Sequence, residues 1–153
     1  MKGRLVLLFF ALVTVTVAQS DHSYSWSAAS TPLHSRAEAK IFAVGPVGFA
    51  GRMSQEERQF KALLALDQQK AKQELERLYS SGNPQAMSYA LVGMRKLDRK
   101  RYAELVVAAR ASDMTVTTMS GCFVESERLR TVADDLDSGK YDPWLRWMET
   151  HSL

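Results

Sequence analysis

The stretch Asn83–Leu97, NPQAMSYALVGMRKL, decides the fold, because it predicts a helix that is apolar on nearly every side. Asn83 can cap this helix, and Pro84 suits its first turn, where the missing N–H needs no partner. Charge appears only late, at Arg95 and Lys96. A helix of this kind must be surrounded by other helices, so we expect the flanking segments to cover it.

Amphipathic helices are predicted on both sides of this central helix. The earliest has the strongest start signal, because Ser54 and Glu57 form a capping box ahead of an apolar stripe. Asp67 and Asp98 are each placed to cap a further helix. The six predicted helices begin at Ser54, Asp67, Asn83, Asp98, Ser126 and Trp144.

One segment breaks the helical pattern. Thr115–Thr118 is β-branched throughout and favours extended structure, and Gly121 permits a turn after it. The most strand-like part of the first half is Ile41–Val44. The predicted fold class is therefore mainly α: a single domain over residues 41–150, a compact bundle of about six helices, with one short two-stranded β-element if residues 115–118 pair with 41–44.

Three glycines at a spacing of three follow that strand-like run, in Gly45–Gly51. The spacing suggests a phosphate-binding loop, but no Lys-Ser/Thr pair follows and no parallel α/β pattern surrounds it. We expect instead a tight connection with Val47 and Phe49 tucked against the helices.

A repeat of 31 residues separates Leu66-Asp67 from Leu97-Asp98. The pattern of each unit predicts an apolar helix, a turn at Asp and an amphipathic helix. Residues 90–98, ALVGMRKLD, resemble the first helix and turn of a HEAT-like repeat, which implies two stacked α-hairpins packed as in such solenoids. The chain also resembles small exported bacterial proteins of uncharacterised function, and that resemblance implies no activity.

The N-terminus has the pattern of a signal peptide over residues 1–20. Lys2 and Arg4 precede an uncharged run of thirteen residues, Leu5–Val17, and small residues follow. The run is short for a membrane span, which needs about 20 apolar residues. We expect export to the periplasm or the cell exterior, no membrane insertion after cleavage, a flexible lead-in over residues 21–40, and a tail at 151–153. An uncleaved anchor is the alternative.

Removing Lys2 and Arg4 lowers the formal net charge from +3 to +1. Such a balance argues against a nucleic-acid partner, which requires a concentrated basic surface. The three histidines, His22, His34 and His151, have no metal-binding spacing. No catalytic constellation and no cofactor motif is visible, so we predict a non-enzymatic protein that binds another protein.

Two groups of residues are candidates for a site. Trp144 and Trp147 lie three apart on the last predicted helix, and tryptophan is enriched at binding hot spots, although docking of that helix on its own domain explains the pair better.

Cys122 is the only cysteine, which favours burial, with a disulfide-linked homodimer or a redox role as alternatives. Together with Met114 and Met119 it would form a soft-ligand set for Cu(I), the basis of an alternative function as a copper or redox-linked envelope protein.

Overall fold

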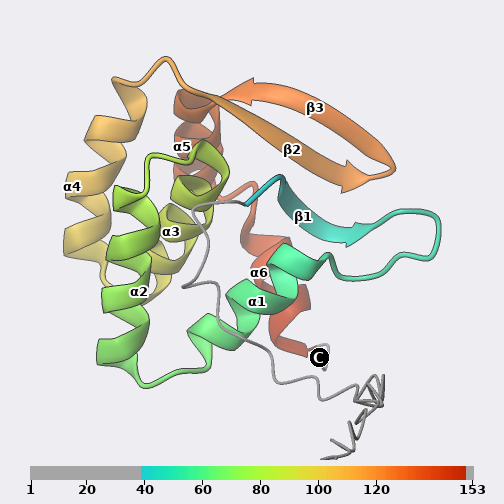
Figure 1. The fold of residues 1–153 in the computed structure, drawn as a ribbon, viewed down its shortest axis with the longest axis horizontal. Helices are drawn as coiled ribbons and strands as arrows, with labels where there is room; N and C mark the ends of the chain where they lie inside the picture. Colours follow the sequence, from blue (N-terminus) through green and yellow to red (C-terminus); the bar gives the residue numbers. More distant parts are fainter. Residues whose placement is uncertain (1–38, 151–153) are drawn as a thin grey trace, which may run out of the picture.

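Helix α3 (Pro84–Leu97) is the element around which the others are arranged, as predicted (Figure 1). The structure, a computed structural model, describes residues 39–150, so the predicted signal peptide, the tail and nearly all of the lead-in lie outside the described residues. Every residue from Ala86 to Met94 is buried. Around α3 lie α1 (Gln55–Leu64), α2 (Gln68–Ser80), α4 (Arg99–Arg110), α5 (Leu129–Ser138) and α6 (Asp142–Thr150).

The predicted helix starts are confirmed where a capping side chain was expected. The Ser54 hydroxyl accepts from the N–H of Glu57, and the Glu57 carboxylate accepts in return from the N–H of Ser54. Asp67, Asn83 and Asp98 cap α2, α3 and α4 through their side-chain oxygens. Asp98 is the single residue between α3 and α4, so it ends one helix and begins the next.

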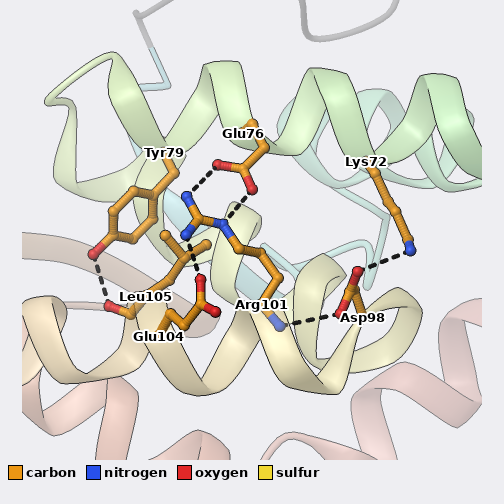
Figure 2. Close-up of polar contacts among 7 residues, drawn as sticks. All are labelled: Lys72, Glu76, Tyr79, Asp98, Arg101, Glu104 and Leu105. Carbon is orange, nitrogen blue, oxygen red and sulfur yellow. Dashed lines mark hydrogen bonds and ion pairs between the residues drawn. The ribbon is translucent and has the colours of Figure 1, made fainter.

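Helices α2 and α4 are joined by a polar network on their exposed faces (Figure 2). Arg101 binds Glu76 through two guanidinium nitrogens, at 2.5 and 2.9 Å, and Lys72 pairs with Asp98 at 2.8 Å. The Tyr79 hydroxyl donates to the carbonyl of Leu105 at 2.8 Å. Because these charges remain partly exposed, each pair contributes at most about 1 kcal/mol to stability and mainly fixes the relative position of the two helices.

A three-stranded sheet lies against one side of the helices, in the order β1-β2-β3. Strand β1 (Phe42–Val47) pairs in parallel with β2 (Thr115–Gly121), placing Phe42 opposite Thr118 and Ala43 opposite Met119. The predicted pairing of the two strand-like segments is therefore confirmed, but its register begins at Thr118, the last residue of 115–118, and continues to Gly121. The core face of the sheet is closed by Phe42, whose ring meets those of Tyr89 and Tyr141 edge to face.

The third strand was not predicted. Strand β3 (Phe123–Arg128) pairs antiparallel with β2, and α5 begins at Leu129, so the prediction of a helix from Ser126 is wrong for its first three residues. The hairpin register pairs each residue from Phe123 to Arg128 with one of β2, and the first buried residue of the helical stripe is Leu129. Gly121 has a φ of 59°, which the first residue of a two-residue type II′ turn requires.

The Gly45–Gly51 loop also differs from the prediction. Phe49 is fully exposed instead of tucked against the helices. The loop projects from the helical body beside the β2–β3 hairpin (Figure 1), and the N–H of Gly48 donates to the carbonyl of Gly121 at 2.8 Å. This hydrogen bond holds the loop at the hairpin turn, beyond the helices, so the Phe49 side chain has no helix to pack against and stays in solvent.

Helices α2 and α3 approach closely at Gly93. A Cβ atom added there would lie 2.5 Å from a methyl carbon of Leu75, whose side chain is completely buried. We expect Gly93→Ala to lower the free energy of unfolding by about 1–2 kcal/mol, because overpacking exceeds the gain in helix propensity. In a Leu75→Ala background the same change should raise stability by about 1 kcal/mol. Urea unfolding of the four proteins checks this, and the same sign in both backgrounds would contradict it.

Candidate functional site

Trp144 lies in the core and not on the surface. Its side chain is 5% exposed, and its indole N–H donates to Glu57 Oε1 at 2.8 Å. Its ring also lies near those of Phe42 and Phe60. Trp144 therefore anchors α6 to the core, while Trp147 is half-buried and packs against the same core. Neither residue presents a freely exposed indole face.

Glu57 is a completely buried carboxylate at the meeting point of three segments. Its Oε1 accepts from the N–H of Gly45 at 2.9 Å as well as from Trp144, and its Oε2 accepts from the N–H of Ser54 at 2.8 Å. Burial raises the pKa of the Glu57 carboxyl, and the hydrogen bonds offset this only in part. All three donors belong to the fold itself, so Glu57 connects β1, α1 and α6.

The pH dependence of the unfolding free energy, compared between the wild type and a Glu57 variant, tests this arrangement. Because its folded-state pKa lies above the ordinary value of 4.5, the folded protein binds this proton more tightly than the unfolded chain does. The associated stability is fully present below that ordinary value and is lost as the pH rises through the folded-state pKa. We expect the unfolding free energy of the wild type, relative to Glu57→Gln, to fall as the pH rises above the ordinary value of 4.5 and through the raised folded-state pKa.

Urea unfolding across this pH range measures the difference. Glu56→Gln is the matched control, since it removes a neighbouring carboxylate that is only half-buried. A wild-type-minus-variant difference that stays flat for Glu57→Gln, or that is equal for both variants, would contradict the assignment.

The three soft-ligand candidates are not brought together. Met114 precedes β2 and Met119 lies within it, so about 16 Å of extended chain separates them. Cys122 lies at the turn between β2 and β3. Among residues 39–150, no group of three or more His, Cys, Asp and Glu side chains is arranged to hold a metal ion.

Cys122 is exposed, so the preference for a buried thiol is wrong. Its place in a hairpin turn explains the exposure, because the turn extends away from the helices (Figure 1). We expect the folded protein to react with one equivalent of 5,5′-dithiobis(2-nitrobenzoate) without denaturant, at a rate close to that in urea, and Cys122→Ser to be inert. A thiol that reacts only after unfolding would contradict this exposure.

The most exposed apolar surface is formed by the hairpin and the adjacent loop. Phe123 and Val124 open β3 with exposed fractions of 75% and 59%, and Phe49 lies in the loop that bonds to the hairpin turn. A contiguous exposed apolar patch, unlike a single exposed apolar residue, is typical of an interaction surface. Among the described residues, no strand pairs with the outer edge of β3.

A pocket of about 420 Å³ opens on the helix-facing side of this edge. It is called the β3 pocket here, and the residues that line it are Val44, Thr118, Met119, Ser120, Phe123, Glu125, Glu127, Lys140 and Tyr141. The register places Glu127 opposite the buried Val116 and Glu125 opposite Thr118, so both carboxylates share the core-facing side of the sheet. An apolar wall with two carboxylates can receive a cationic side chain that has an aliphatic stem.

Glu127 is the least satisfied acidic group of this pocket. Its Oε2 is shielded from solvent and has no hydrogen-bond partner among residues 39–150. Lys140, which also lines this pocket, binds Asp135 Oδ2 through its Nζ at 2.5 Å and makes no hydrogen bond to Glu127 Oε2. The hydrogen bond to Asp135 is the main cause that raises the pKa of Lys140, and the negative charges of Glu127 and Glu125 add to it. A buried acceptor without a donor costs about 1–3 kcal/mol, which a donor from outside would recover.

This surface was not predicted from the sequence. The signal was present in Phe123–Arg128, FVESER, in which apolar and acidic residues lead directly out of a Gly turn, but a helix starting at Ser126 fitted the same letters. Only the register with β2 shows that Phe123, Glu125 and Glu127 lie on one face.

Comparison of the chain with family models, with curated proteins and with solved structures finds no match. Within residues 39–150, no helix has the length and apolar content needed to cross a bilayer.

Proposed function

We propose that this chain is an exported, non-enzymatic protein-interaction module that binds an extended segment of another protein along the outer edge of β3. The observation that carries the proposal is a β3 edge that no strand within residues 39–150 pairs with, beside a pocket in which Glu127 Oε2 has no donor from the same residues. Export rests on the basic and apolar leader at residues 1–20.

Backbone pairing would supply the affinity. Residues flanking a two-residue hairpin loop exchange hydrogen bonds with each other, so the ladder alternates from Ser120 and Phe123 onward. In that alternation the main-chain groups of Val124 and Ser126 point away from β2. An added strand can use these groups, as in other cases of strand addition to an exposed edge.

Side chains would supply the specificity. Alternate residues of an added strand face the β3 pocket, where Glu125 and Glu127 favour a lysine or arginine and Phe123 favours an apolar neighbour. A second copy of this chain fits less well. A two-fold axis perpendicular to the sheet would place Glu125 and Glu127 of both copies on the same face, where like charges repel.

The helices serve as the rigid support in this proposal. The units α1–α2 and α3–α4, each with an Asp cap at the turn, are proposed as two HEAT-like hairpins that hold the sheet in place. The helices would then hold the β3 edge in a fixed position, and the hairpin would extend from them far enough to contact the partner.

A selection from displayed random peptides on the protein without residues 1–20 tests the proposal, in a Cys122→Ser background that prevents disulfide capture. We expect enriched peptides with alternating apolar and cationic residues. Glu127→Gln should weaken their binding about tenfold. Ser126→Pro, which removes an outward N–H while leaving the ladder to β2, should abolish it.

Glu104→Gln is the matched control, because it removes an exposed carboxylate on α4 and leaves Arg101 paired with Glu76. Far-UV circular dichroism confirms that each variant is folded. Absence of such peptides, or binding retained by both β3 variants, would refute the β3 site. A wild-type dimer that Ser126→Pro dissociates would identify a second copy as the occupant.

A further inference from the structure

A second hollow lies away from the sheet, where the end of α3 and the start of α4 meet α6. Its volume is about 330 Å³. The charged side chains that line it are Arg95, Lys96, Arg99, Arg146, Asp142 and Glu149, and it is called the arginine hollow here. Four cations thus face two carboxylates, which leaves an excess of two positive charges.

The two carboxylates are already occupied. Arg95, whose side chain is 14% exposed, pairs with Asp142, and Lys96 pairs with Glu149. Arg99 and Arg146 are exposed and have no ion-pair or hydrogen-bond partner for their side chains among residues 39–150. The excess charge therefore resides on two guanidinium groups that are free to bind.

The positive charges of Arg99 and Arg146 both affect the carboxylate of Asp142. The pKa of Asp142 is lowered first by its hydrogen bond from Arg95 and further by the positive charges of Arg146 and Arg99. The three arginines and Asp142 line the same hollow, and only Arg95 contacts the carboxylate directly. Their helices fix this arrangement, because Arg95 lies in the last turn of α3, Arg99 begins α4 and Arg146 lies one turn after Asp142 on α6.

We propose that the arginine hollow binds a phosphate group in its dianionic form. Guanidinium presents paired N–H donors that match two oxygens of a phosphate, and Arg is preferred over Lys for this geometry. A dianion neutralises the excess of two charges, whereas a single carboxylate leaves one uncompensated. The site is separate from the β3 pocket and does not depend on the proposed partner binding.

Phosphate could reach the hollow on a soluble phosphomonoester or on a lipid headgroup. Phenyl phosphate is the soluble probe, followed by ¹H–¹⁵N NMR of the arginine Nε–H groups. We expect saturable 1:1 binding with shifts at Arg99 and Arg146. The double variant Arg99→Gln/Arg146→Gln should weaken binding at least about tenfold and should remain folded, since neither side chain has a partner to lose in the part of the chain that the structure describes.

Arg128→Gln/Arg130→Gln is the matched control, because it removes two exposed arginines that bind Asp113 elsewhere on the surface. Equal weakening in both double variants, or no saturable shift in the wild type, would refute the site. Co-sedimentation with phosphatidic acid–phosphatidylcholine vesicles, set against phosphatidylcholine alone, identifies the source. Vesicle binding that depends on Arg99 and Arg146 indicates a lipid phosphate, and binding of phenyl phosphate alone indicates a soluble one.

Discussion

The burial of α3 on all sides is the constraint on which the rest of the structure depends. From Ala86 to Met94 the helix has no solvent-facing residue, so α2, α4, α5 and the sheet must each cover part of it. Such a helix cannot exist alone in water, because its apolar surface is removed from solvent only by the elements around it. Gly93 marks where this covering is tightest, since Leu75 of α2 occupies the space of the missing side chain.

Polar groups inside the fold differ in energetic importance from those on its surface. The ion pairs joining α2 to α4 stay partly hydrated, so losing one changes stability little. Glu57 is completely enclosed and accepts hydrogen bonds from three N–H donors in separate segments, so removing its carboxylate would leave all three donors without an acceptor. Tyr89 has a similar role, because its buried hydroxyl accepts from the N–H of Ala43 at 3.0 Å and so holds β1 against α3.

Local signals in the sequence predicted most of the helical framework. Caps at Ser54, Asp67, Asn83 and Asp98 are decided within a few residues, and the apolar character of α3 is visible directly. The hairpin was not predicted in the same way, although its two strands are neighbours in sequence, because the residues after the Gly121 turn fit a helix beginning at Ser126 as well as a strand.

The candidate site depended on that pairing entirely. Glu127 becomes significant only because the register places it opposite Val116, on the face of the sheet where Phe123 and Tyr141 line the same pocket. The exposure of Cys122 and Phe49 could not be predicted either, because cysteine and phenylalanine are usually buried. Both are exposed in this protein because the hairpin and the loop extend beyond the helices.

The parallel pairing of β1 with β2 also sets the order in which the sheet can form. Four helices lie between these strands in the chain, whereas β2 and β3 are neighbours joined by a two-residue turn. Closing a long loop costs more entropy than closing a hairpin, so contacts distant in sequence form late. Strand β1 can therefore pair with β2 only after the helices between them have formed. Until then both edges of the β2–β3 hairpin are unpaired. During folding this short sheet is the part of the chain most exposed to pairing with other molecules.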